Sequence, residues 1–194
     1  MPLRKAAAAM RSSGIDSKIL ELKTLESYQV EEEWQKRVKA VAERYIQAIT
    51  EGQSEHWLYI SGQTGSGKTH ICTAVCKALM QNGKTVRYIT WSDLVHKFEQ
   101  SRFSTVEHDK LIADISGVDV LYIDDLFKTQ RNAEIAYEVI NLRYIGRKPL
   151  IISTEALVST IAEIDPAIEG RITEMSSGFI CQIKPESSRN WRKK

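Results

Sequence analysis

The most informative stretch of the chain reads GQTGSGKT and runs from Gly62 to Thr69. It completes the pattern GxxxxGK[ST], in which glycines let the backbone turn so that successive amide N–H groups point toward phosphate oxygens. An apolar run over 57–60 precedes the stretch, and a helical pattern over 68–81 follows it. Because a loop between a buried strand and the positive end of a helix attracts phosphates, the stretch predicts a P-loop that binds ATP.

The residue types of this P-loop assign a task to each side chain. Lys68 is expected to reach the β- and γ-phosphates and to act in catalysis, and the Thr69 hydroxyl to bind Mg²⁺. The predicted nucleotide-binding residues are Gly62, Gln63, Thr64, Gly65, Ser66, Gly67, Lys68, Thr69 and His70. ATP or ADP and Mg²⁺ are therefore the expected ligands.

Strand and helix patterns alternate along the rest of the chain. The predicted strands are 57–60, 85–90, 118–123, 150–153 and 179–183. The predicted helices are 31–52, 68–81, 92–100, 105–116, 132–145 and a short one that begins at Asp165-Pro166. Such alternation indicates an α/β fold of the P-loop NTPase type, with a five-stranded, mostly parallel sheet and helices on both faces.

Two adjacent carboxylates follow the third predicted strand. The apolar run VLYI places Asp124 and Asp125 at the carboxyl end of that strand, where open parallel sheets bind their ligands. We assign Asp124 to Mg²⁺, directly or through water, and Asp125 to orienting or deprotonating the attacking water. The alternative is that one of the two merely caps the following turn. The pair favours an ATPase that activates water over a small-molecule kinase, which needs a substrate pocket instead.

The bulk composition is that of an ordinary globular protein. The 194 residues suffice for one domain, and 42% hydrophobic with 27% charged residues excludes the disordered class. No apolar run approaches the roughly 18 to 20 residues that cross a bilayer, and the start lacks a signal peptide's apolar segment. A cytoplasmic protein without a membrane partner is expected. Cys72, Cys76 and Cys181 lack zinc-site spacing and are expected to be buried thiols.

Three segments divide the chain. Residues 1–23 show little periodicity and are expected to form an arm or linker, and 24–183 to form the ATPase core. The net charge is only +2, but the tail 184–194 carries five basic residues and one acidic residue. Contact of this tail with nucleic-acid phosphates and a merely solvated end both remain open.

Four motifs in consistent order resemble one family. They are GSGKTHICTA (65–74), LYIDDLFK (121–128), RKPLIISTE (147–155) and IDPAIEGRI (164–172). Together they resemble an AAA+ replicative helicase loader of the DnaC/DnaI type, especially forms carried by phages and mobile elements of Gram-positive bacteria. The resemblance covers about residues 24–192 and implies an AAA+ core. Because few residues follow Arg171, the helical lid domain of AAA+ proteins is expected to be reduced or absent.

The resemblance also implies further site residues. The end of the fourth strand corresponds to sensor 1, where a polar side chain contacts the γ-phosphate or the attacking water. Glu155 stands where many members have asparagine, so Thr154 or Ser153 is expected to take that role. Arg171 corresponds to the arginine finger, which enters a neighbouring subunit's ATP site and contributes about 10³- to 10⁵-fold in rate. A surface ion pair is the alternative for Arg171.

Two other segments acquire roles from the resemblance. Loaders and related initiator ATPases carry a helical insertion at 91–117 that helps to hold single-stranded DNA. Its candidate contacts are Lys97, Phe98, Arg102 and Phe103, although core phenylalanines and solvated charges would produce the same pattern. The segment TLESY (24–28) resembles the part that packs near adenine. Full-length loaders carry an N-terminal helicase-binding domain, which the short segment before residue 24 does not match.

The expected function is ATP-dependent loading of a hexameric replicative DNA helicase. ATP and single-stranded DNA would stabilise self-assembly on the helicase, hydrolysis at subunit interfaces would release the loader, and turnover would be weak without DNA or partner. The chain alone is expected to be monomeric. The alternatives are an IstB-like transposition helper ATPase, a P-loop kinase, and a nucleotide switch with little turnover.

Overall fold

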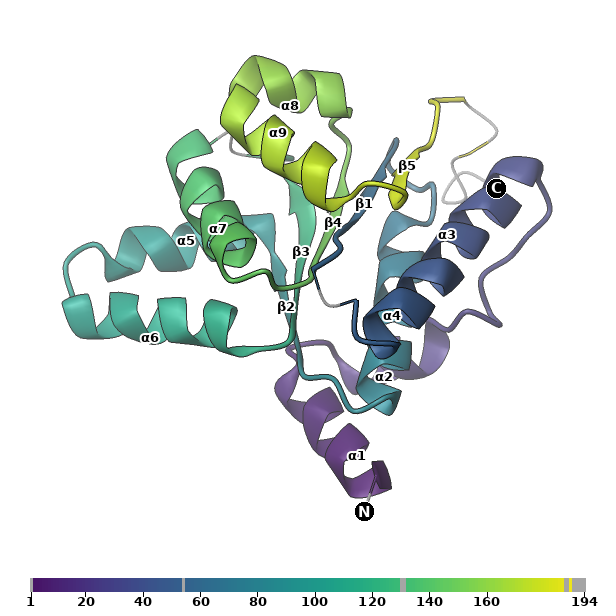
Figure 1. Ribbon diagram of the computed structural model, residues 1–194, viewed down its shortest axis with the longest axis horizontal. Coiled ribbons are helices and arrows are strands. Elements are labelled where there is room, and N and C mark those ends of the chain that lie inside the picture. The colour runs from purple at the N-terminus through teal and green to yellow at the C-terminus, as the bar shows by residue number, and fades with distance from the viewer. Residues whose placement is uncertain (1, 54, 130–131, 187–188, 190–194) are drawn as a thin grey trace.

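A parallel five-stranded sheet forms the centre of the molecule (Figure 1). The computed structural model describes residues 2–53, 55–129, 132–186 and 189. Its strand order is β2-β3-β4-β1-β5, and every neighbouring pair is parallel. The strands are β1 (Leu58–Ser61), β2 (Val86–Thr90), β3 (Val120–Leu126), β4 (Leu150–Thr154) and β5 (Ile180–Gln182). The predicted α/β fold is confirmed.

The apolar strands pack on both sides of the sheet. Successive side chains of a strand point to opposite faces. In β3, Leu121 and Ile123 join one buried cluster, whereas Val120 and Tyr122 join the other. Both faces of the sheet are therefore buried, which explains why the parallel strands have continuous apolar sequences instead of alternating ones.

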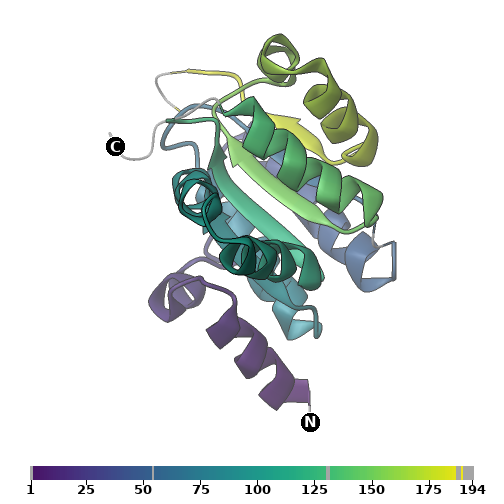
Figure 2. The same ribbon diagram turned by 90° about the vertical axis from the view of Figure 1, so that its left-hand side faces the viewer.

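Helices cover each face, as Figure 2 shows. The face with Tyr122 packs against α3 (Glu33–Thr50) and α4 (Lys68–Gln81), and the N-terminal helices α1 (Pro2–Ser12) and α2 (Ser17–Leu22) lie beside α4. The opposite face carries α5 (Trp91–Ser101), α6 (Thr105–Gly117), α7 (Ala133–Ile145), α8 (Val158–Ile164) and α9 (Pro166–Met175). Helices α5 and α6 form a hairpin that extends away from the sheet (Figure 1).

The N-terminal segment contains helices that the sequence did not predict. Ala9, Ile15 and Leu20 are buried in the same cluster as α3 and α4. The Tyr88 amide of β2 donates to the Ser13 carbonyl at 2.7 Å, so this segment also holds the edge strand. The buried side chains described in α1 are the small residues Ala6 and Ala9, and α2 is only six residues long, so neither helix shows a run of large apolar residues in the sequence.

Helix ends and strand ends agree closely with the sequence, with two differences. Gly83 has the positive φ of +82° expected after a helix end, and Asp165 caps α9 by accepting from the amides of Ala167 and Ile168. Helix α8 was not predicted. Strand β3 continues past Ile123 to Leu126, with a register shift against β4 that brings both aspartates into the strand. Within the described residues, no helix has both the length and the apolar character to cross a membrane.

Candidate nucleotide-binding site

The P-loop, Gly62–Thr69, connects the end of β1 to the start of α4. Gly65 and Gly67 both have φ of +82°, a conformation that favours glycine. A Cβ atom on Gly62 would lie 2.8 Å from the Ile183 Cβ, and one on Gly67 would lie 3.2 Å from the Tyr28 ring. Ile183 and Tyr28 therefore pack closely against the loop, so that a side chain at either glycine would require its neighbour to move.

Lys68 lies under the P-loop with 5% of its surface exposed. Its Nζ donates to the carbonyl oxygens of Gly62 at 2.8 Å and Gln63 at 2.9 Å. Burial lowers the pKa of Lys68, and the nearby carboxylates of Glu155 and Asp125 oppose that shift. The ammonium group is thus held at the loop by neutral acceptors, which a phosphate oxygen can replace.

Asp124 accepts hydrogen bonds from four hydroxyl groups. Thr69 donates at 3.2 Å, Tyr122 at 2.9 Å and Tyr88 at 3.2 Å, and Ser153 also donates to this carboxylate. Asp124 is 5% exposed. The strand end therefore holds the carboxylate beside the Thr69 hydroxyl, the two side chains to which the sequence assigned a shared Mg²⁺ ion.

The donor set around Asp124 fits magnesium. Carboxylate and hydroxyl oxygens are hard ligands, and Mg²⁺ in nucleotide sites takes one or two carboxylates together with substrate phosphates. Among the described residues, no group of three or more histidine, cysteine, aspartate or glutamate side chains could hold a metal alone. Thr69 and Asp124 would therefore hold the ion only when a nucleotide supplies the other ligands.

A phosphate cavity of about 300 Å³ opens in front of the P-loop. It is lined by Lys23, Thr64, Gly65, Gly67, Lys68, Thr69, His70, Asp125, Lys128 and Glu155. Asp125 has φ of +58°, and its carboxylate forms an ion pair with Lys128 at 2.8 Å. The structure thus brings Lys68, Thr69 and Asp125 together as predicted. The cavity is also lined by Lys23 and Lys128, which the sequence did not assign to the site. Lys128 nevertheless belongs to the motif LYIDDLFK (121–128).

The end of β4 corrects one expected role. The Thr154 hydroxyl donates to the Leu126 carbonyl at 2.6 Å and accepts from the Ala156 amide at 3.0 Å, and Thr154 is fully buried. Both hydrogen-bonding capacities serve the backbone, so Thr154 does not face the phosphate cavity. Glu155, which the sequence left in doubt, lines that cavity and accepts a hydrogen bond from Thr64.

Other P-loop side chains have structural partners. The Gln63 amide group donates to the Glu186 carbonyl at 2.6 Å and accepts from the Glu186 amide at 3.0 Å. Ser66 donates to the Gln63 carbonyl at 2.9 Å. These contacts hold the segment after β5 along the P-loop, so the side chain of Gln63 stabilises the loop instead of facing the phosphate cavity.

A second cavity lies beside Ser66 and Gly67, and we call it the base cavity because it is lined by residues of the segment 24–28, which resembles the part that packs near adenine. Its volume is about 270 Å³, and it is lined by Ser27, Tyr28, Gln29, Gln35, Ser66, Gly67 and His70. His70 Nε2 lies 3.1 Å from both the Thr24 carbonyl oxygen and the Ser27 hydroxyl, which docks residues 24–28 on α4. Burial lowers the pKa of His70, although the bond to Thr24 opposes the shift. The Tyr28 hydroxyl is buried without a hydrogen-bond partner among the described residues.

Arg171 lies on α9 and faces α7. Its guanidinium donates to Asn141 at 3.1 Å, to the Tyr137 hydroxyl at 3.1 Å and to the Ala167 carbonyl at 2.9 Å. It also lies 4.8 Å from the ring centre of Tyr137. Arg171 lines neither the phosphate cavity nor the base cavity of its own chain. The alternative expectation, an ion pair with a neighbouring glutamate, is absent from the ion pairs of the described residues.

The helical hairpin α5–α6 separates the four DNA candidates. Phe98 is 4% exposed and packs in the core, edge-on to His108, so its expected role in base stacking is wrong. Phe103, at the tip, is 96% exposed. Arg102 is exposed, and Lys97 lines a cavity of about 650 Å³ between the two helices.

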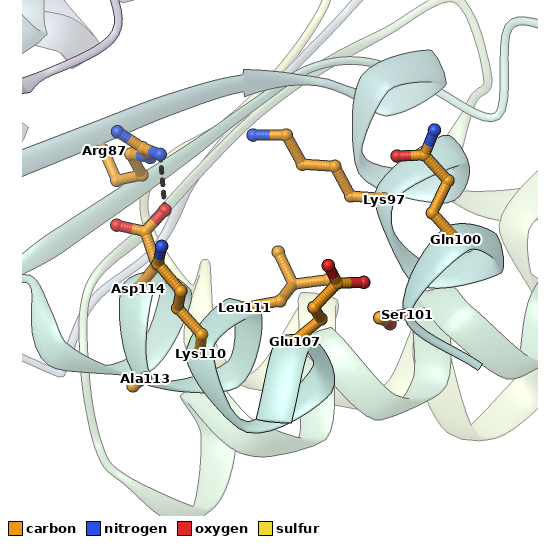
Figure 3. A pocket seen from close by; sticks show the side chains of 9 residues that line it. All are labelled: Arg87, Lys97, Gln100, Ser101, Glu107, Lys110, Leu111, Ala113 and Asp114. Carbon is orange, nitrogen blue, oxygen red and sulfur yellow. Dashed lines mark ion pairs between the residues drawn. The ribbon is translucent and has the colours of Figure 1, made fainter. Parts of the chain in front are cut away.

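This interhelical cavity has a mixed lining (Figure 3). Arg87 forms an ion pair with Asp114 on one side, whereas Lys97 and Lys110 extend from the facing helices. Leu111 supplies an apolar part of the wall. The basic tail expected over 184–194 lies mostly outside the described residues, which include only 184–186 and 189 of it.

The fold and the P-loop site define an ATP-binding protein of the AAA+ class. The family described as IstB-like ATP binding protein matches residues 3–191, and the chain belongs to that family.

Three relatives carry names from replication, phage-like elements and insertion sequences. XkdC of the phage-like element PBSX of Bacillus subtilis (strain 168) is 33% identical over 131 residues, 63% of this chain and 48% of XkdC. The replicative helicase loader DnaC of Escherichia coli (strain K12) is 30% identical over 130 residues, 65% of this chain and 52% of DnaC. A putative insertion sequence ATP-binding protein of Sinorhizobium fredii (strain NBRC 101917 / NGR234) is 31% identical over 142 residues, 69% of this chain and 45% of that protein. The matched region spans about half the length of these relatives.

Solved structures of replication proteins share the fold. The crystal structure of DnaI superposes with a TM-score of 0.69 at 17% identity, covering 91% of this chain and 94% of DnaI. The replication initiator DnaA bound to AMPPCP and single-stranded DNA superposes with a TM-score of 0.73 at 18% identity, covering 89% and 52%. The predicted relationship to DnaC and DnaI is thereby confirmed at the level of family and fold.

Proposed function

We propose that this chain is an ATP-dependent loader of a hexameric replicative DNA helicase, which binds ATP with Mg²⁺ and hydrolyses it at subunit interfaces. The observation that carries the proposal is the group formed by Lys68, Thr69, Asp124 and Asp125 at one edge of the sheet. The relative DnaC, a replicative helicase loader, supports the choice of client.

Each side chain of this group has one task in the proposed hydrolysis. Lys68 leaves its two carbonyl acceptors and binds the β- and γ-phosphates. Thr69 and Asp124 hold Mg²⁺, which neutralises phosphate charge when it is bound. Asp125 orients the attacking water or accepts its proton, and it must leave the ion pair with Lys128 at least partly to do so.

The arginine that completes the site comes from a neighbouring subunit in this proposal. Arg171 lies between α7 and α9 with part of its side chain exposed, and it is not part of its own phosphate cavity. A residue that acts on a neighbouring subunit's nucleotide must be exposed and must lie outside its own site. It then meets a nucleotide only when the subunits assemble. Hydrolysis would thereby depend on assembly.

Single-stranded DNA is proposed to bind along the hairpin α5–α6. Phe103 offers an exposed ring for base stacking, and Lys97 and Arg102 offer charge for the backbone. Lys110, which lines the interhelical cavity from the facing helix α6, adds a cation that the sequence did not single out.

Co-purification with a hexameric replicative helicase tests this function directly. The full chain is incubated with the helicase in ATP or ADP, with and without a single-stranded oligonucleotide, and the retained protein is measured. ATP should give retention, DNA should increase it, and ADP should not support it. The matched control is Lys68→Ala, which should lose the ATP dependence. Equal retention in ATP, in ADP and by the Lys68 variant would contradict ATP-controlled loading.

The family match supports a second candidate, an IstB-like transposition helper ATPase. The two candidates share the nucleotide site and differ in the client. A parallel co-purification with an insertion-sequence transposase separates them, since ATP-dependent retention by only one client identifies the function.

A nucleotide switch with little turnover is a third candidate. Asp124→Asn should abolish Mg²⁺-dependent phosphate release in a helicase loader while nucleotide binding is largely kept. No phosphate release by the wild type, with helicase and DNA present, would favour the switch.

A further inference from the structure

Lys128 is placed between two carboxylates at the mouth of the phosphate cavity. Its Nζ lies 2.8 Å from the Asp125 carboxylate and 3.5 Å from the Glu155 carboxylate. The Lys128 side chain is 38% exposed. A nucleotide bound in the cavity would therefore face the same ammonium group that contacts both carboxylates.

The backbone before Lys128 holds it in this place. Asp125 and Phe127 have φ of +58° and +62°, values that non-glycine residues rarely adopt, and the Lys128 amide donates to the Asp125 carbonyl at 3.1 Å. Phe127 is 6% exposed and packs edge-on against Trp91. Because Phe127 is anchored in the core, the next residue is directed back over the cavity. Such conformations persist only where the surroundings impose them.

The charges of the cavity explain why a cation is needed there. Glu155 and Asp125 are acidic, and Lys68, which binds the same phosphates, lies buried nearby. Bringing a terminal phosphate close to Glu155 adds repulsion between like charges, which is strong where water is partly excluded. Thr64 donates one hydrogen bond to Glu155, but a hydroxyl carries no compensating charge. Lys128 is the cation that contacts both carboxylates among the ion pairs of the described residues.

We propose that Lys128 is a positioning residue that offsets the charge of Glu155, and that this pairing allows the site to hold the terminal phosphate of a nucleoside triphosphate. The inference rests on the proposed binding of ATP at the P-loop. Glu155 is charged and therefore needs Lys128 of the same chain as an ion-pair partner. A neutral side chain at position 155 would need no such partner. The effect should be large for a triphosphate and small for a diphosphate, since only the triphosphate brings a γ-phosphate toward Glu155.

The test compares the affinities of AMPPCP and ADP, each with Mg²⁺, by calorimetry on the full chain. Lys128→Gln should weaken AMPPCP binding at least about tenfold and ADP binding much less. Lys128→Arg, which keeps the charge, should stay close to the wild type. In the double variant Lys128→Gln with Glu155→Gln, most of the AMPPCP affinity should return, because the unpaired carboxylate is gone.

Lys36→Gln is the matched control, since Lys36 also forms an ion pair with the residue three positions earlier, Glu33, but on the exposed surface of α3. This variant should bind both nucleotides like the wild type. Thermal melting checks that each variant is folded.

The outcomes separate the inference from the proposed function. Failure of the wild type to bind either nucleotide would reject ATP binding and, with it, the role of Lys128. Binding by the wild type together with unchanged AMPPCP affinity in Lys128→Gln would reject the role of Lys128 alone. Loss of affinity without recovery in the double variant would also overturn the pairing with Glu155.

Discussion

Ser153 and Thr154 are neighbours on β4, yet their hydroxyl groups have different partners. Because successive strand residues point to opposite faces, Ser153 reaches the Asp124 carboxylate, whereas Thr154 bonds to the backbone at Leu126 and Ala156. At the scale of single residues, one position along a strand therefore decides between a contact with Asp124, the proposed metal ligand, and a structural contact.

The partners of Thr154 predict the effect of removing its hydroxyl. Thr154→Val should lower the free energy of unfolding by about 1–3 kcal/mol, because the buried Leu126 carbonyl and Ala156 amide lose their partner. Urea unfolding measures the change, and nucleotide affinity should remain near that of the wild type while the variant is folded. The control is Thr173→Val, which removes an exposed hydroxyl on α9. A large, specific loss of ATP affinity in Thr154→Val would instead restore the sensor role.

Two contacts between elements determine how the site is enclosed and extended. Residues 24–28 contact α4 through His70, and the hairpin α5–α6 is anchored on the sheet through Phe98 while its tip stays exposed. The first contact leads to a prediction about pH dependence, and the second to a prediction about truncating the phenylalanines of the hairpin.

The docking of residues 24–28 on α4 should depend on pH through His70. Burial lowers the pKa of His70 below its ordinary value of 6.5, so the folded state resists protonation. As pH falls below 6.5, the unfolded chain binds the proton first and stability is lost, until the pH passes the folded-state pKa. Urea unfolding at pH 7.5, 6.5 and 5.5 should therefore show a smaller loss for His70→Gln than for the wild type. Parallel curves for the two proteins would contradict this coupling.

The two phenylalanines of the hairpin should respond oppositely to truncation. Phe98→Ala should cost about 3–5 kcal/mol of stability, because it leaves a cavity in the core. Phe103→Ala should change stability by less than about 0.5 kcal/mol. If the tip stacks on DNA bases, Phe103→Ala should weaken single-stranded DNA binding by about 1–3 kcal/mol. Unfolding curves and fluorescence anisotropy with a labelled oligonucleotide measure the two effects, and unchanged DNA affinity would remove Phe103 from the proposed surface.

At the scale of the whole molecule, the nucleotide site of one chain lacks the arginine proposed to complete it. Arg171 packs against α7 and lines neither cavity at the P-loop of its own chain. The ATPase rate should therefore depend on which chains are neighbours in the assembly, and this can be measured by mixing two different inactive variants.

Arg171→Ala and Asp124→Asn chains should each be inactive when they are assembled alone on helicase and DNA. In a one-to-one mixture, an interface with an intact pocket on one side and an intact arginine on the other forms about a quarter of the time, so about a quarter of the wild-type ATPase rate should return. Phosphate release measures the rate, and melting curves check that loss of the contacts to Asn141 and Tyr137 does not unfold the chain. Full activity of Arg171→Ala alone would exclude the finger.

Local chemistry made the P-loop, the strands and most helices predictable from the sequence. The glycines between Gly62 and Gly67, the buried apolar runs and the capping pair Asp165-Pro166 act through neighbouring backbone groups, so their consequences appear within a few residues. Asp124 and Asp125 were predicted for a related reason, because parallel strands end at one edge of the sheet. The two N-terminal helices were not predicted, because α1 buries small alanine side chains and α2 has only six residues.

Only the tertiary structure decided which of these side chains share a cavity. The sequence by itself determined the fold class, the P-loop and the pair of carboxylates near the carboxyl end of β3. It did not determine that Phe98 is core while Phe103 is exposed, that Thr154 serves the backbone, or that Lys128 faces Glu155. The physical reason is that these facts depend on the rotation of a helix, the register of two strands and a left-handed turn. Each of those features is set by packing between segments far apart in the chain.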